Sequence, residues 1–132
     1  MKPIIKSEHS EQACVIDFCK RMAGSHPELD LIFAIVNGAA LTWKEDARGK
    51  RYSPQASKLK AEGLKNGVPD LFLPVPHHGL FGLWIEMKLP GGVVGKEQRD
   101  FMNAVVGLGY QATVCRSADE AIETIKEYLG IE

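Results

Sequence analysis

The stretch GVPDLFLPVPHHGLFGLWIEMKL, residues 67–89, decides the fold of this chain. It holds two apolar runs, at 70–75 and 80–89, joined by the short connection PHHG. Two apolar runs joined in this way predict an antiparallel hairpin. Pro74 and Pro76 restrict the end of the first strand to a sheet edge or a break, because proline has no N–H to donate to a β-ladder.

Helices and strands alternate on both sides of this hairpin, as judged from the spacing of apolar residues and from turn residues. The predicted elements are helices at 8–22, 54–65, 96–108 and 117–129, a strand at 31–36 buried on both faces, an irregular polar stretch at 39–53, and a strand at 111–115. This order indicates one α/β domain over residues 1–132, with a mixed sheet of about four strands flanked by helices.

Length and composition exclude several classes of protein. The 132 residues are 45% hydrophobic and 25% charged, which is ordinary for a globular domain. No apolar run approaches the roughly 20 residues that span a bilayer, and the first residues do not resemble a secretory signal. Three cysteines are too few for a disulfide framework, so a reducing cytoplasm is expected. The glycines near residue 92 lack the GK[ST] ending of a phosphate-binding loop, and no nucleotide cofactor is expected.

Charge is segregated along the chain although the formal net charge is only −1. Residues 44–65 hold seven basic and three acidic side chains, a net charge of +4. Such a segment can be a solvated surface or a contact with phosphates. The composition alone favours neither.

The second strand of the hairpin carries the first candidate for chemistry. Alternation places Glu86 and Lys88 on one face and Leu83, Ile85 and Met87 on the other. An exposed ion pair is the ordinary explanation for a glutamate and a lysine in this pattern. Antiparallel pairing, however, brings Asp70 opposite them. Two neighbouring carboxylates repel unless a cation bridges them, and oxygen ligands of this kind suit Mg²⁺ or Mn²⁺.

The first helix offers a further carboxylate. Glu8 and Glu11 lie seven and four residues before Val15, so both fall on the apolar stripe of the helix. Helical periodicity does not choose between them. The alternative explanation is an acidic first turn that interacts favourably with the helix dipole, and for Glu11 this alternative is preferred.

Two sets of residues carry a family resemblance. Pro69-Asp70 followed by Glu86-Met87-Lys88 resembles the PD-(D/E)XK nuclease signature. The stretch LKAEGLKNGVPDLFLPVPHHGLFGLWIEMKLPGG, with Glu97-Gln98 and Leu108-Gly109-Tyr110 after it, is similar to the VRR-NUC family of that superfamily. The similarity runs from about residue 8 to residue 129 and implies a restriction-endonuclease-like core.

The resemblance also implies roles for individual residues. Asp70, Glu86 and the backbone carbonyl of Met87 would be ligands of Mg²⁺ or Mn²⁺, and Lys88 would be the catalytic lysine. The family places its helix-one acid four residues before a glutamine, a spacing that Glu8 and Gln12 match, so Glu8 is favoured over Glu11.

The start of the second long helix both matches and departs from the family. Gln98 matches a family glutamine near the metal site. Gly95-Lys96 replaces the Ser-Pro pair that many members carry there; glycine is tolerated as an N-cap, and Lys96 is expected to contact a phosphate.

The function implied by the resemblance is a metal-dependent endonuclease acting on branched DNA such as a Holliday junction. The stand-alone members are phage and bacterial proteins, and a homodimer is the usual expectation. The expected phosphate contacts are Lys50, Arg51, Lys58, Lys60, Lys65 and Lys96. A flap, nick or single-strand nuclease and a non-cleaving DNA-binding module remain alternatives.

Overall fold

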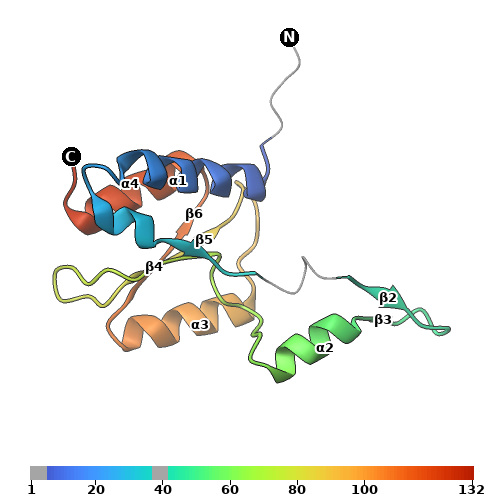
Figure 1. The fold of residues 1–132 in the computed structure, drawn as a ribbon. Helices are drawn as coiled ribbons and strands as arrows, with labels where there is room; N and C mark the ends of the chain where they lie inside the picture. Colours follow the sequence, from blue (N-terminus) through green and yellow to red (C-terminus); the bar gives the residue numbers. More distant parts are fainter. Residues whose placement is uncertain (1–5, 37–41) are drawn as a thin grey trace, which may run out of the picture.

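A four-stranded sheet lies between two layers of helices in the computed structural model, which describes residues 6–36 and 42–132 (Figure 1). The sheet order is β1-β4-β5-β6. The strands are β1 (Phe33–Ala34), β4 (Leu71–Leu73), β5 (Leu83–Met87) and β6 (Gln111–Cys115). The long helices are α1 (Glu8–Met22), α3 (Lys96–Gly107) and α4 (Ala118–Leu129). The expected α/β class with a mixed four-stranded sheet is confirmed.

The central strands form the antiparallel hairpin that the sequence predicts. β4 and β5 are antiparallel, with Leu71 opposite Ile85 and Leu73 opposite Leu83. β5 and β6 are parallel, because α3 provides the crossover between them. β4 ends at Leu73, directly before Pro74, so the proline breaks the strand as expected.

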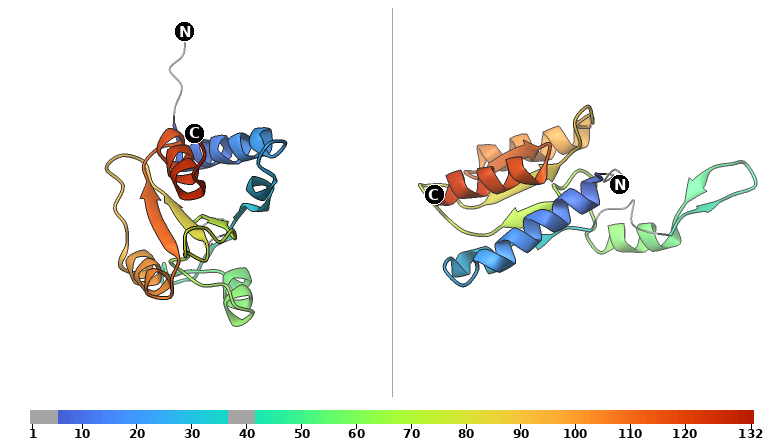
Figure 2. Two further views of the ribbon diagram at one scale, coloured as in Figure 1. Left: turned by 90° about the vertical axis from the view of Figure 1, so that its left-hand side faces the viewer. Right: turned by 90° about the horizontal axis from the view of Figure 1, so that it is seen from above.

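The alternation along β5 separates the main core from a smaller aromatic layer. Leu83, Ile85 and Met87 are buried beneath α1 and α4, which Figure 2 shows side by side over one face of the sheet. On the other face, Trp84 stacks on Phe72 of β4, with ring centroids 4.1 Å apart. Phe101 of α3 meets the same indole edge-on at 5.2 Å. The two faces of β5 therefore have different partners, and Glu86 lies on the α3 side.

The prediction of a strand buried on both faces at 31–36 is wrong. Residues Pro27–Leu31 form a 3-10 helix, and β1 is only two residues long. β1 lies at the edge of the sheet, and Phe33 is 49% exposed. A continuous apolar run shows that a segment is apolar, but not that a second layer covers it.

An arm, residues 42–61, projects from the body of the domain (Figure 2). It consists of the hairpin of β2 (Lys44–Glu45) and β3 (Arg51–Tyr52) and of α2 (Pro54–Ala61). The sequence predicted no strands at 39–53, of which 39–41 lie outside the described residues. The helix predicted at 54–65 ends at Ala61, where Gly63 takes up a positive φ of 115°.

No helix within the described residues is long and apolar enough to cross a membrane.

Candidate active site

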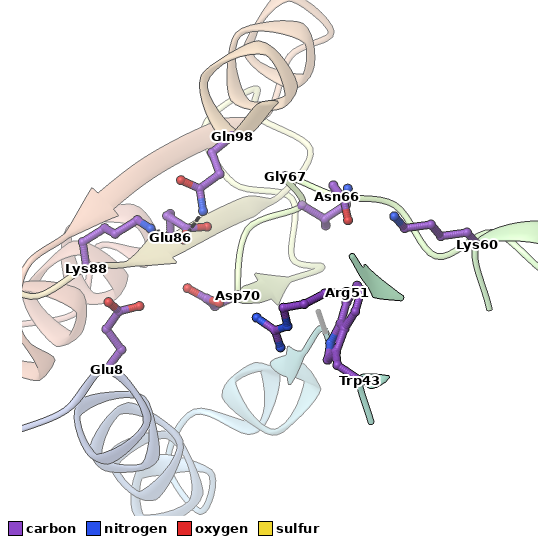
Figure 3. Close-up of a pocket in the computed structure, with 11 residues that line it drawn as sticks. Glu8, Trp43, Arg51, Lys60, Asn66, Gly67, Asp70, Glu86, Lys88 and Gln98 are labelled. Carbon is purple, nitrogen blue, oxygen red and sulfur yellow. Dashed lines mark hydrogen bonds and ion pairs between the residues drawn. The ribbon is translucent and has the colours of Figure 1, made fainter. Parts of the chain in front are cut away.

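An open pocket of about 660 Å³ lies where the sheet, the start of α1, the start of α3 and the arm meet. Its lining combines carboxylates, cations and amides, as Figure 3 shows. The lining residues are Glu8, Trp43, Arg51, Lys60, Asn66, Gly67, Val68, Asp70, Glu86, Lys88 and Gln98. All five side chains predicted for the catalytic site are among them.

Strand pairing brings Asp70 and Glu86 together. Asp70 immediately precedes β4, and the pairing of Leu71 with Ile85 places it beside the end of β5. Its Oδ2 atom accepts a hydrogen bond of 2.8 Å from the backbone N–H of Met87. The Asp70 side chain is thus tied to the strand that carries Glu86 and Lys88.

Glu86 is buried, with only 3% of its surface exposed. Its Oε1 atom accepts a hydrogen bond from Nε2 of Gln98 at 3.0 Å and lies 3.8 Å from Nζ of Lys88. Its Oε2 atom is buried without a hydrogen-bond partner among the described residues. A buried carboxylate oxygen without a donor is costly, and such groups mark positions where a ligand or ion completes the coordination.

The surroundings raise the pKa of Glu86 from its ordinary value of 4.5 to about 8. Burial is the largest cause, because it disfavours the charged form. Repulsion from the Asp70 carboxylate is the next, while the Lys88 ammonium acts in the opposite direction. Perturbed carboxyl groups beside a second carboxyl group in an open pocket are typical of functional sites.

Gln98 is oriented by the start of α3. Its Oε1 atom accepts a hydrogen bond of 2.8 Å from the N–H of Gly95, the N-cap residue. The amide NH₂ group is therefore directed toward Glu86. Gly67 allows this helix start to approach the loop before Asp70: a Cβ at residue 67 would lie 2.7 Å from the backbone of Glu97.

The two acidic residues of α1 have different surroundings. Glu8, the first residue of the helix, is exposed and lines the pocket; Figure 3 shows its carboxylate pointing into the space beside Lys88 and Asp70. Glu11 is buried, and its Oε1 atom accepts from the N–H of Ala118 at 3.4 Å, at the start of α4. The placement favours Glu8 for the site and gives Glu11 a structural contact.

The carboxylates fit a divalent cation. Across the described residues, no three His, Cys, Asp or Glu side chains already lie close enough together to hold a metal ion. Glu8 of α1, Asp70 of the loop before β4 and Glu86 of β5 nevertheless line the same pocket (Figure 3). A cation there would give the buried Oε2 of Glu86 a partner and relieve the repulsion between the carboxylates. Oxygen-only donors of this kind suit Mg²⁺ or Mn²⁺ with retained waters.

The cations expected to bind DNA divide into two groups. Arg51 and Lys60 of the arm line the pocket, whereas Lys50, Lys58, Lys65 and Lys96 do not. The Nζ atom of Lys96 instead lies 2.7 Å from Oδ2 of Asp100, one turn further along α3.

Sequence reasoning missed several lining residues, above all Trp43. Trp43 lies just before β2, and the Cζ atom of Arg51 lies 5.5 Å from the centroid of its ring. An aromatic residue next to the basic segment was the available signal. Only the hairpin register, which the sequence did not predict, brings that residue to the pocket.

Comparison with known proteins identifies the family of this chain. The model of the VRR-NUC domain family matches residues 7–119. A solved structure named as a VRR_NUC domain protein superposes with a TM-score of 0.74 and 26% sequence identity, over 99% of this chain and 93% of that chain. No curated protein matches the chain. With a family match across most of its length, this chain belongs to the VRR-NUC family and carries a nuclease-type domain.

Proposed function

We propose that this protein is a Mg²⁺- or Mn²⁺-dependent endonuclease that hydrolyses phosphodiester bonds in branched DNA. The observation that carries the proposal is the buried Glu86 carboxylate, held beside Asp70 and Lys88 in an open pocket. A purely structural domain has no use for a costly group of this kind at a solvent-accessible site.

The cation would be held by Glu8, Asp70, Glu86 and the backbone carbonyl of Met87. When bound, it stabilises negative charge on a phosphoryl oxygen. Gln98 fixes one oxygen of Glu86 through its amide, and the other oxygen has no hydrogen-bond partner among the described residues. The Asp70 side chain is fixed by the N–H of Met87. Positioning of this precision is what in-line displacement at a phosphate requires.

Lys88 supplies a positive charge beside Glu86. Its Nζ atom is 3.8 Å from Glu86, and its side chain is only 15% exposed. A partly buried ammonium acts more strongly than one in bulk water, because less solvent screens it. In this proposal Lys88 orients the attacking water and stabilises the charge that develops on the phosphate.

Arg51 and Lys60 bind phosphates on the opposite side of the pocket. Such contacts position a nucleic-acid backbone but carry no sequence information. This favours recognition of DNA structure over DNA sequence. A homodimer fits the same substrate, because a four-way junction has approximate two-fold symmetry and a C₂ dimer presents two sites to two strands.

A cleavage panel tests the proposal. Purified protein with Mg²⁺ or Mn²⁺ is incubated with a mobile four-way junction, a 5′ flap, a single strand and a plain duplex, and Asp70→Asn serves as the inactive control. Symmetric cuts in the junction, absent in the control, are the expected result. Cutting of flaps or single strands alone would keep the chemistry and reject the junction. Tight junction binding with no cutting of any substrate would make the protein a binding module.

A further inference from the structure

The arm presents an aromatic side chain and a cation to the pocket at the same place. Trp43 is 36% exposed and lines the pocket. The guanidinium of Arg51 lies over its ring, 5.5 Å from the centroid, within the range of a cation–π contact. Figure 3 shows the two side chains next to each other, with the guanidinium directed toward Asp70.

The arm has a second exposed aromatic residue, whose position relative to the pocket differs from that of Trp43. Tyr52 is 44% exposed and directly follows Arg51, but it does not line the pocket. A single exposed apolar side chain needs no explanation on its own. The exposure of Trp43 does need an explanation, because this side chain borders the same space as the carboxylates. Proteins that hold unpaired nucleotides combine cations for the backbone with aromatic rings on which bases stack.

We propose that Trp43 is a specificity-determining residue, which stacks on an uncovered base at a branch point while Arg51 binds the adjoining phosphate. The inference rests on the proposed nuclease function. In continuous duplex both faces of every base are covered by neighbouring bases. At a branch point the arms separate when they unstack, which uncovers base faces, so the indole contributes to the binding of branched DNA and not of duplex.

A structural role for Trp43 predicts something different. If the indole only supports the hairpin through Arg51, its removal displaces the arm cations. The affinity for every DNA then falls by a similar factor, and the salt dependence of binding becomes weaker. Stacking instead predicts a decrease confined to branched DNA, with unchanged salt dependence, because tryptophan releases no counterions.

The chain has two tryptophans, so the fluorescence of each can be measured in a variant that lacks the other. Trp84 lies between Phe72 and Phe101 and does not line the pocket. The Trp84→Phe variant therefore carries Trp43 as its single tryptophan, and Trp43→Phe carries Trp84, so selective excitation of tryptophan reports each indole separately. Both are made in the Asp70→Asn background with Mg²⁺, so that the DNA stays uncut. Anisotropy of labelled junction, flap and duplex reports binding separately.

Stacking predicts that Trp43 emission is quenched when junction or flap binds and is unchanged when duplex binds. Trp84 emission should not change when any of these DNAs binds. Affinity measurements do not depend on the folding of the Trp84 variant. Trp43→Ala should weaken the binding of branched DNA by roughly 5- to 100-fold and that of duplex by less than about twofold. Trp43→Phe should keep most of the affinity, and the matched control Tyr52→Ala should keep all of it.

Two results would overturn the inference and leave the nuclease proposal intact. One is branched DNA that binds, by anisotropy, without quenching Trp43. The other is an equal decrease in affinity for branched and duplex DNA in Trp43→Ala. A wild-type protein that binds none of the DNAs would reject the stacking role and the proposed function together.

Discussion

The sheet side and the arm side of the pocket are built in contrasting ways. Asp70 and Glu86 lie at the middle strands of the sheet, and each is fixed by a hydrogen bond from a neighbouring residue. Arg51 and Lys60 lie on an arm that projects from the body of the domain, in which most residues are exposed and each strand has two residues. One side is held by the core, and the other mainly by its own local structure.

This difference matches two kinds of task. Bond hydrolysis requires catalytic groups held within roughly 0.5 Å of a productive geometry, which buried strands provide. Phosphate binding tolerates looser placement, since it depends on charge more than on direction. Substitutions on the sheet side should therefore change the rate of chemistry, and those on the arm side the affinity for DNA.

The largest expected effect is on cleavage, from Lys88→Ala. Removal of the partly buried ammonium should reduce the cleavage rate at saturating DNA by at least about 100-fold, because no other described lysine lines the sheet side of the pocket. Single-turnover assays measure this rate. Lys60→Ala, a lysine on the arm side, should reduce it by less than about tenfold at saturation. Similar reductions in the two variants would remove the distinction between the two sides.

Substitutions of the two acidic residues of α1 should also have different consequences, one for cleavage and the other for stability. The effect on cleavage should be smaller than that of Lys88→Ala. Glu8→Gln is expected to reduce cleavage by roughly tenfold or more without changing the melting temperature, because Glu8 lines the pocket and is exposed. Glu11→Gln should retain cleavage and lower the free energy of unfolding by about 0.5–1 kcal/mol, because its carboxylate contacts the start of α4. Thermal unfolding and cleavage are measured on both variants. The opposite pattern would assign the helix-one acid to Glu11.

Glu86 should make the metal-free protein less stable as pH rises. Its folded pKa of about 8 lies above its ordinary value of 4.5, so the native state binds more protons than the unfolded state between these values. Stability from this group is fully present below pH 4.5 and is lost as pH rises through 8. Glu86→Gln, which carries no charge, should stabilise the protein by more than about 1 kcal/mol at pH 9 in EDTA.

The control for this comparison is the same pair of proteins at pH 4.5, where both side chains are neutral in the folded state and the stability difference should be much smaller. Denaturant unfolding in EDTA measures both differences. A difference that does not depend on pH would show that burial does not raise the pKa of this carboxyl.

The sheet side of the pocket was largely predictable from the sequence because its geometry is local. Antiparallel pairing of two neighbouring strands brings Asp70 to the end of the strand that carries Glu86 and Lys88, and alternation places these two on one face. The position of Glu8 was not predictable from periodicity, since Glu11 lies on the same stripe. Packing of α4 against α1 separates the two acids.

The arm was not predictable in the same way. β2 and β3 have two residues each, too few to produce a recognisable alternation. The contribution of Trp43 and Arg51 depends on where the hairpin lies relative to the sheet, and no pattern within residues 43–65 encodes that placement. The prediction of a buried strand at 31–36 was wrong for a related reason. The exposure of β1 depends on what covers the sheet edge, and the apolar run does not encode that.

The smallest expected effect is on the salt dependence of DNA binding, and it tests the arm directly. Removing one cation that binds a phosphate should reduce the slope of log K against log salt by about 0.9, so Arg51→Ala and Lys60→Ala together should reduce it by roughly 2. Lys20→Ala, an exposed lysine in the last turn of α1 that does not line this pocket, is the matched control and should leave the slope unchanged. Fluorescence anisotropy between about 50 and 200 mM salt measures the slope. An unchanged slope in the double variant would mean that the arm cations do not bind phosphates, and DNA would then have to be held by the sheet side alone.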